Sequence, residues 1–119
     1  MPGVEKRSFD SPDETRTPDK TTIDVVRMGD TSAARMTFEP GWRWSECVKP
    51  VAGTDSCQAP HTGYVVSGRL ATRMDDGQEM EFGPGESFEI PPGHDGWTIG
   101  NEPAVVLDFT GAEHYAESP

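Results

Sequence analysis

The sequence has no long hydrophobic run and no surplus of positive charge, and these two absences exclude whole classes of protein. No apolar stretch approaches the ~18–20 residues that a membrane-spanning helix needs. Only 10 Lys and Arg stand against 21 Asp and Glu, for a net charge of −11 over 119 residues. Phosphate binding needs concentrated Lys and Arg. The sequence therefore predicts neither an integral membrane protein nor a nucleic-acid-binding protein.

Cysteine is scarce too, with Cys47 and Cys57 as the two examples. The polar N-terminus lacks the apolar core of a signal peptide, which favours a cytoplasmic protein. In a reducing compartment, a free thiol or a metal ligand is favoured over a disulfide. Nucleophile motifs such as Gly-x-Ser-x-Gly are also missing around the serines.

Glycine and proline, in contrast, are abundant, with 13 and 11 copies. They punctuate short apolar runs, and this density argues against a helical bundle. Asp76-Gly77 between two alternating runs is a strong hairpin signal. The pattern predicts eight or nine short strands with no convincing helix, typical of an all-β sandwich or barrel. The predicted runs are 23–26, 33–38, 42–48, 64–66, 69–74, 79–82, 87–90, 96–99 and 104–109.

The run 42–48 carries two of the three tryptophans. If it is a strand, the period of two places Trp42, Trp44, Glu46 and Val48 on one face. An acid among tryptophans is unfavourable unless it is paired or faces a ligand. Glu46 is therefore a candidate for a residue that reaches into a site.

The chain divides into three segments by composition. Residues 1–20 are rich in Pro and charge and are expected to form an extended or disordered arm. Residues 21–112 hold the predicted strands and are expected to form one barrel. Residues 113–119 are expected to be a C-terminal tail.

Two stretches resemble the motifs of the cupin superfamily, in particular its small stand-alone bacterial members. Gly85, Pro91 and Gly93 match the second motif in type and spacing, and residues 61–68 (HTGYVVSG) look like the end of the first. The resemblance implies a double-stranded β-helix, or jelly roll, of two antiparallel sheets. Because cupins often pair through sheet edges and an unprotected edge invites pairing, it also implies a homodimer.

The metal-binding residues of these motifs are replaced in this sequence. The Glu position is occupied by His61, the two His positions by Asp55 and Cys57, and the last His position by Gly96. The usual ligand set of three His and one Glu is thus not carried over.

A different metal site is predicted from Cys57, His61 and His94, because the motifs place all three at the barrel mouth. Asp55 or Glu46 could add an oxygen ligand. One thiolate with two imidazoles suits Zn²⁺ and would also accept Fe²⁺, Ni²⁺ or Cu²⁺. Each of the three residues also has a structural alternative. His61 could be an inward histidine hydrogen-bonded to a backbone carbonyl or a carboxylate, His94 could be a loop histidine whose ring holds the corner in place, and Cys57 could be a small buried apolar side chain.

Three functions remain open at this stage. The first is a protein that binds a small organic ligand, through a divalent metal if one is held. The second is a small enzyme, an isomerase, cyclase, lyase or oxygenase, using the metal as Lewis acid or His61 as general acid–base with Glu46 or His94 as partner. The third is an interaction module with a vestigial pocket. The candidate catalytic residues are His61 and Glu46, and the candidate ligand-binding residues are Trp44, Glu46, Tyr64, His94 and Trp97.

Overall fold

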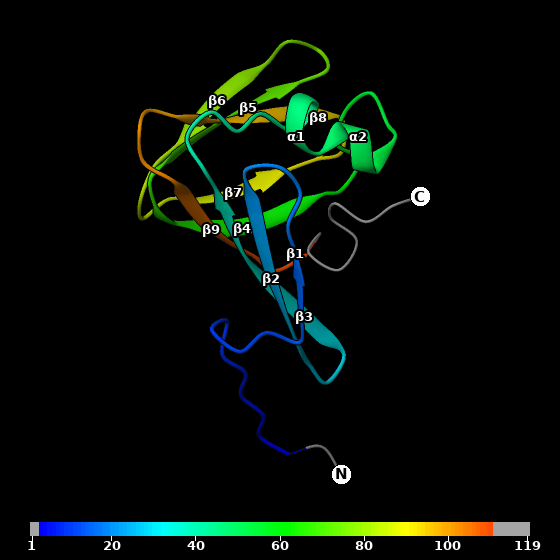
Figure 1. The fold of residues 1–119 in the computed structure, drawn as a ribbon, viewed down its shortest axis with the longest axis vertical. Coiled ribbons are helices and arrows are strands. Elements are labelled where there is room, and N and C mark those ends of the chain that lie inside the picture. Colours follow the sequence, from blue (N-terminus) through cyan, green and yellow to red (C-terminus); the bar gives the residue numbers. More distant parts are fainter. Residues whose placement is uncertain (1–2, 111–119) are drawn as a thin grey trace.

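The structure, a computed structural model, describes residues 3–110, and its regular secondary structure is mainly antiparallel β-strand (Figure 1). Its strands form two sheets, a larger one with the order β1-β2-β3-β9-β4-β7 and a smaller one with the order β6-β5-β8. The strands are β1 (Glu14–Arg16), β2 (Thr21–Met28), β3 (Thr31–Phe38), β4 (His61–Ser67), β5 (Arg69–Met74), β6 (Glu79–Phe82), β7 (Ser87–Ile90), β8 (His94–Ile99) and β9 (Ala104–Asp108). This arrangement confirms the predicted all-β jelly roll of two antiparallel sheets.

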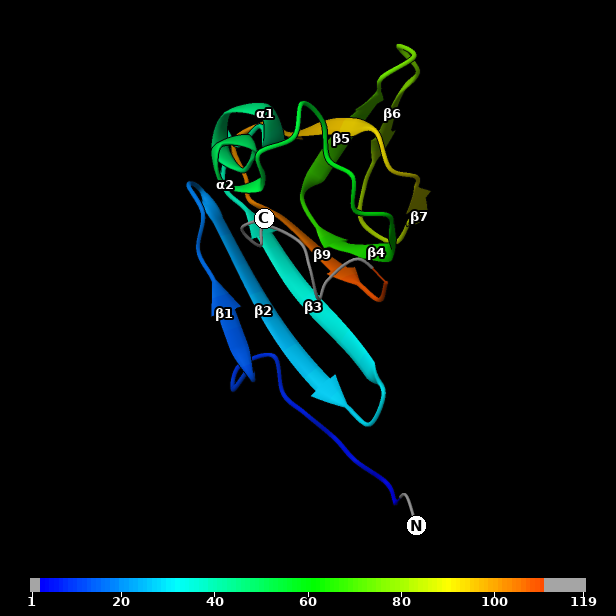
Figure 2. The same ribbon diagram turned by 90° about the vertical axis from the view of Figure 1, so that its right-hand side faces the viewer.

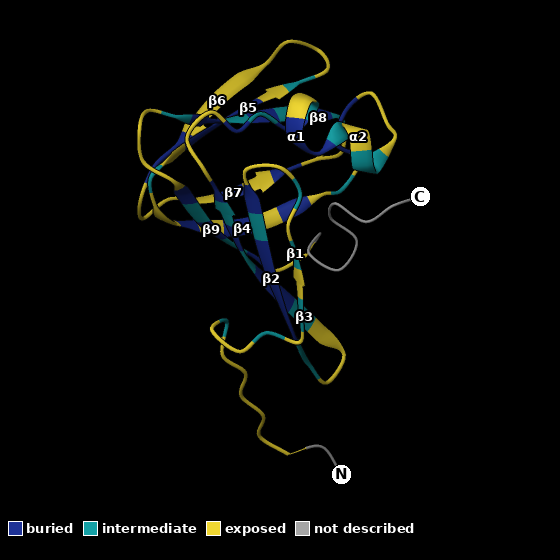
Figure 3. Cartoon of the chain, in the orientation of Figure 1, coloured by how far each residue is buried: buried dark blue, intermediate teal, exposed yellow. Residues whose placement is uncertain are grey.

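The two sheets face each other at one end of the molecule. Figure 2 shows the small sheet lying opposite β4, β7 and β9, while the β2–β3 hairpin extends away from it. Inward side chains of both sheets form the core. Buried positions alternate with exposed ones along β4 and β7 and with half-buried ones along β8 (Figure 3). The core includes Met36, Val65 and Val106 from the large sheet and Leu70 and Phe82 from the small one.

The turn residues act as the sequence predicts. Gly77 has a φ of +97° in the turn that joins β5 to β6, a conformation that glycine adopts without steric penalty. Cys47 and Cys57 are free thiols, as expected. None of the helices in residues 3–110 combines the length and the apolar character required to cross a membrane.

The segment predicted as an arm, 1–20, includes one short strand. β1 pairs with β2 in antiparallel register, with Glu14 opposite Val25 and Arg16 opposite Ile23. The preceding described residues continue as an extended chain beyond the β2–β3 hairpin (Figure 1). The predicted tail, 113–119, lies outside the described residues.

The strand predicted over 42–48 is wrong. Most of this region forms the one-turn helix α1 (Trp44–Cys47), and a second one-turn helix, α2 (Lys49–Ala52), follows it. Helical spacing buries Trp44, Cys47 and Val48 together and leaves Glu46 exposed. The period of two and the helical period both account for Trp44 and Val48, and the burial of Cys47 and the exposure of Glu46 distinguish the helix from a strand.

Candidate metal centre

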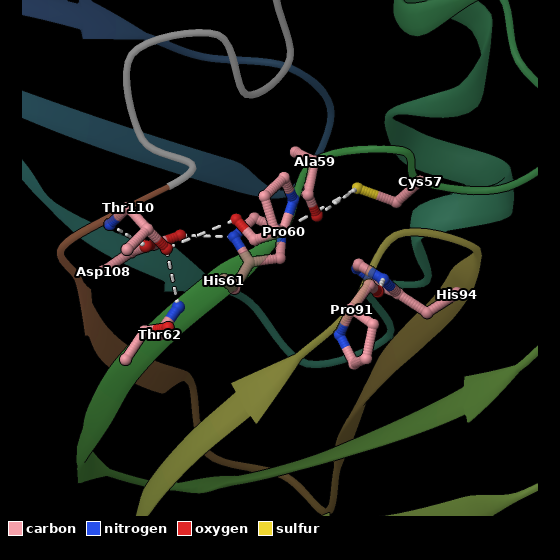
Figure 4. A network of polar contacts seen from close by, with 9 residues as sticks. All are labelled: Cys57, Ala59, Pro60, His61, Thr62, Pro91, His94, Asp108 and Thr110. Carbon is pink, nitrogen blue, oxygen red and sulfur yellow. Dashed lines mark hydrogen bonds and ion pairs between the residues drawn. The ribbon is translucent and has the colours of Figure 1, made fainter.

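The chain brings Cys57, His61 and His94 together from three separate segments. His61 begins β4, His94 begins β8, and Cys57 lies in the loop between α2 and β4 (Figure 4). Their candidate ligand atoms all lie within 4.8 Å of one another. All three side chains are buried. The predicted convergence of these residues is therefore present in the structure.

Main-chain hydrogen bonds hold Cys57 beside His94. The two residues form an isolated β-bridge, in which the Cys57 N–H donates to the His94 carbonyl at 2.7 Å. The Gly93 N–H donates to the Cys57 carbonyl at 2.7 Å. The loop that carries the thiol is thus fixed to the start of β8 by the backbone.

The loop around Cys57 is also fixed by polar side chains. The Ser56 hydroxyl donates to a carboxylate oxygen of Asp75 at 2.9 Å, and the Thr54 hydroxyl donates to the Ser56 carbonyl at 2.7 Å. The Asp75 N–H donates to the Gly93 carbonyl, which extends the connection to the turn before β8. The loop before Cys57 is therefore fixed to the turn before β8 by side-chain as well as main-chain hydrogen bonds.

The Nδ1 atom of each imidazole forms a hydrogen bond with an acceptor outside the cluster. His94 Nδ1 lies 2.8 Å from the Pro91 carbonyl, which can only accept, so Nδ1 carries the proton. His61 Nδ1 is hydrogen-bonded to Oδ2 of Asp108. In the neutral form both rings then keep a lone pair on Nε2, and the Nε2 of His61 lies 3.7 Å from the Cys57 sulfur.

The electrostatics of the cluster favour the charged forms of Cys57 and His61. Burial opposes ionisation of the thiol, but hydrogen bonds and charge from His61 and His94 outweigh it and lower the pKa of Cys57 to about 6. Burial likewise disfavours the imidazolium, but Asp108 and Cys57 raise the pKa of His61 to about 9. A thiolate is the form of cysteine that binds metals.

Asp108 is the functional residue that the sequence reasoning missed. It is 1% exposed and ends the most apolar strand of the chain, β9. An acid in such a strand needs a partner, and this was the signal available in the sequence. Its second carboxylate oxygen, Oδ1, accepts the Thr110 N–H at 3.0 Å, so Asp108 is held in place as well (Figure 4).

The cluster borders a pocket between the two sheets. The pocket has an empty volume of about 410 Å³, counting its open mouth. Trp44, His61 and His94 are among the residues that line it. The rest of the lining is mainly apolar, with Met36, Phe38, Trp42, Leu70, Thr72, Phe88, Ile90, Gly96, Val106 and Asp108.

Three of the predicted ligand-lining residues lie elsewhere. Glu46 is exposed because α1 turns it away from Trp44. Tyr64 is 41% exposed because it alternates with the buried Gly63 and Val65 on β4. Both residues are absent from the lining of the pocket, so the expectation that they reach into it is corrected.

Trp97 also lies outside the pocket, on the opposite face of the small sheet. It alternates with the inward Gly96 and Thr98, and the Arg43 guanidinium packs 4.5 Å from its ring centroid. Asp55, considered as an oxygen ligand, has a fully exposed side chain that pairs with Lys49 at 3.6 Å. Neither residue belongs to the cluster.

Comparison with known proteins identifies the fold family. The family profile described as Cupin domain matches residues 34–110, more than half of the chain. No curated protein sequence matches the chain.

Several solved structures share the fold at low sequence identity. A protein of unknown function from Rhizobium leguminosarum bv. viciae 3841 is 20% identical, with 91% of this chain and 96% of that chain covered and a TM-score of 0.66. A polyketide cyclase from Streptomyces resistomycificus is 18% identical, with 92% and 80% covered and a TM-score of 0.66. A sugar phosphate isomerase of the cupin superfamily from Silicibacter pomeroyi is 19% identical, with 88% and 74% covered and a TM-score of 0.63. The family profile and the jelly-roll architecture agree, and this chain belongs to the cupin family.

Proposed function

We propose that this cupin holds a divalent metal on Cys57, His61 and His94 and binds a small organic ligand in the adjoining pocket. The observation that carries the proposal is the hydrogen bonding of the two imidazoles. The Nδ1 atom of His61 is hydrogen-bonded to Asp108, and the Nδ1 atom of His94 is hydrogen-bonded to the Pro91 carbonyl. Histidines that ligate metals almost always have such a partner, which fixes the ring and its tautomer.

The donor set fits a borderline metal ion. A thiolate and two imidazoles are ligands of Zn²⁺, and Fe²⁺, Ni²⁺ and Cu²⁺ accept the same atoms. Three protein ligands leave a coordination position free, as in catalytic zinc sites rather than closed structural ones. When bound, the metal would supply a Lewis acid for an oxygen of the ligand.

The remainder of the pocket supplies an apolar, water-excluding wall. Phe88, Ile90 and Val106 lie in the lining from β7 and β9, and Leu70 lies opposite them on β5. Small-molecule sites typically combine such walls with a few polar groups that orient the ligand. The ligand therefore has a compact apolar body and a polar end that reaches the cluster.

The test is the metal content of the full chain after purification without an affinity tag. We expect about one divalent ion per chain, and at least ~10-fold weaker binding in Cys57→Ala, His61→Ala and His94→Ala. Cys47→Ala is the matched control, since Cys47 is also buried and free but lies outside the cluster. Cobalt loading should give a thiolate-to-metal charge-transfer band that Cys57→Ala abolishes and Cys47→Ala keeps.

Results of two kinds would contradict the proposal. One is a protein that takes up no zinc, iron, nickel or copper in stoichiometric amounts. The other is a bound metal whose affinity is unchanged by all three cluster substitutions.

A second candidate function is catalysis by the same cluster without a metal. It is favoured by the buried hydrogen bond between His61 and Asp108, because a carboxylate that orients an imidazole is a recurrent acid–base arrangement. In this case His61 transfers the proton and Asp108 orients the His61 ring. Asp108 then takes the role of acid–base partner that the sequence suggested for Glu46. A metal-free chain that turns over a small substrate, with activity lost in His61→Ala, would favour this function over ligand binding through a metal.

We also propose that the protein is a homodimer and that it is located in the cytoplasm. The large sheet ends at β7 on one side and at β1 on the other, and unprotected sheet edges pair readily. Sedimentation equilibrium at micromolar concentration tests the dimer, and a monomeric mass would contradict it.

A further inference from the structure

The indole N–H of Trp42 is a buried donor without an acceptor. Trp42 is 4% exposed, and among residues 3–110 no hydrogen-bond partner reaches its Nε1. Buried polar groups are nearly always paired, and an unmade hydrogen bond of this kind is destabilising. Because Trp42 also lies in the wall of the pocket, a ligand is the natural source of the missing acceptor.

The ring of Trp42 is held in place on both sides. It stacks on Phe38 with ring centroids 4.0 Å apart and planes inclined by 27°. A Cβ built on Gly96 would lie 3.6 Å from Cζ3 of the indole, so the ring edge packs against the glycine backbone. The Trp42 carbonyl accepts the Thr98 N–H at 3.0 Å. The ring cannot turn to another acceptor without breaking these contacts.

Trp42 and the metal cluster are connected through neighbouring inward positions of β8, because His94 belongs to the cluster and the Trp42 ring packs against Gly96, two residues further on. His94 and Gly96 both line the pocket from β8, and two residues of a strand span about 6.7 Å. Thr72 is the cross-strand partner of Gly96 on β5 and also lines the pocket. A ligand held at the cluster and reaching Trp42 therefore needs a body of about this length, roughly that of a ring with a substituent at each end.

Charge restricts the far end of the ligand. The described residues that line the pocket include no lysine or arginine. A second carboxylate at the Trp42 end would be buried without a cation, which is unfavourable. A neutral acceptor such as a carbonyl or ether oxygen fits this end, and an anionic oxygen fits the metal end.

We infer that the ligand is a small, single-ring molecule with an anionic oxygen for the metal and a neutral oxygen that accepts the Trp42 N–H. This inference rests on the proposed function, since the cluster holds one end of the ligand. It adds a class of ligand and a specificity-determining residue, Trp42.

The test compares three acids on the zinc-loaded full chain. 4-Acetylbenzoate has a carboxylate and a ketone oxygen, 4-isopropylbenzoate replaces that oxygen by a methyl group, and terephthalate replaces the ketone by a second carboxylate. We expect 4-acetylbenzoate to bind at least ~10-fold more tightly than either of the others. Isothermal titration calorimetry measures the three affinities.

A Trp42→Phe variant isolates the hydrogen bond. Phenylalanine keeps the aromatic stacking on Phe38 and removes the N–H donor. In this variant the preference for 4-acetylbenzoate over 4-isopropylbenzoate should disappear, so that the ratio of the two affinities falls from at least ~10 to about 1. Trp97→Phe is the matched control, because Trp97 lies on the opposite face of the small sheet.

Indole ¹⁵N–¹H spectra give an independent readout. The three tryptophans give three indole signals, assigned with Trp→Phe variants at each position. Only 4-acetylbenzoate should move the Trp42 signal downfield, while the Trp97 signal stays in place.

The outcomes separate this inference from the proposed function. Equal affinities for the ketone and the hydrocarbon, a Trp42 signal that does not move, or a zinc-loaded chain that binds none of the acids would overturn the inference and leave the metal centre intact. Failure of the chain to take up zinc, iron, nickel or copper would instead overturn the proposed function, and the inference with it.

Discussion

Nδ1 of the His61 imidazole is hydrogen-bonded to the carboxylate of Asp108, 47 residues further along the chain. The pairing of β4 with β9 produces this contact, since Asp108 lies directly opposite Gly63, two residues after His61. The predicted ligand His61 thus depends on a carboxylate that a neighbouring strand delivers.

We predict that Asp108→Asn lowers zinc affinity by about 10–100-fold, because the amide can still accept from Nδ1–H but lacks the charge that makes the ring a better ligand. Competition with a chromophoric chelator measures the affinity. Asp55→Asn is the matched control, since Asp55 has an exposed side chain outside the cluster. Equal affinities in the two variants would contradict the assigned role of Asp108.

The close approach of β4 and β9 at Gly63 gives a second prediction. A Cβ on Gly63 would lie 1.9 Å from the Leu107 carbonyl oxygen and 2.9 Å from Cζ of Phe88. Gly63→Ala should therefore lower the free energy of unfolding at the upper end of the ~1–3 kcal/mol range for overpacking, because a backbone atom has to move. Urea unfolding measures the loss, and Gly3→Ala, which has open space, should be neutral. A stable Gly63→Ala chain would disprove the close approach.

The start of α1 gives a third prediction. A carboxylate oxygen of Asp95, on β8, accepts the Ser45 N–H at 3.0 Å, in the role that an N-cap side chain usually fills. Asp95→Ala should lower the free energy of unfolding by about 1 kcal/mol, as read from thermal unfolding. Asp95→Asn keeps an acceptor oxygen and should recover most of the loss. If Asn is as destabilising as Ala, the hydrogen bond is not the cause.

The ion pairs of Glu14 give a pH dependence. Hydrogen bonds from Arg16 and Arg27 lower the pKa of Glu14 from 4.5 to about 2. A carboxyl whose pKa is lower in the folded state adds stability above pH 4.5 and loses it as the pH falls toward 2. The Glu14 side chain is 38% exposed, so solvent screening limits the contribution to about 0.5–1 kcal/mol.

Wild-type and Glu14→Gln chains should therefore differ in urea midpoint at pH 7 and converge near pH 2. Glu102→Gln is an exposed control that should show no such convergence. A difference that persists unchanged at pH 2 would contradict the ion-pair explanation.

The sequence was sufficient for most of the fold because its strands are bounded by local signals. Gly77 marks the β5–β6 turn, and the spacing of Gly85, Pro91 and Gly93 marks the family motif and the strand between them, β7. Such signals depend only on the backbone preferences of the residues themselves. The convergence of Cys57, His61 and His94 followed from the same motifs.

The errors arise where distant residues decide the outcome. The cap of α1 comes from Asp95, 50 residues away, and no local pattern around Trp44 reveals it. The alternation assumed for Glu46 was therefore wrong. Tyr64 failed for a related reason, since a period of two does not say which face of β4 is inside.

In many small metalloproteins, metal binding and folding depend on each other, and the β-bridge between Cys57 and His94 makes them independent here. In those proteins, the ion organises the polypeptide, and chelation denatures it. Here main-chain bonds already align the thiol with one imidazole. If the proposed metal is bound, its occupancy can change with the supply of ion while the two sheets stay folded, so that metal loading is reversible without refolding.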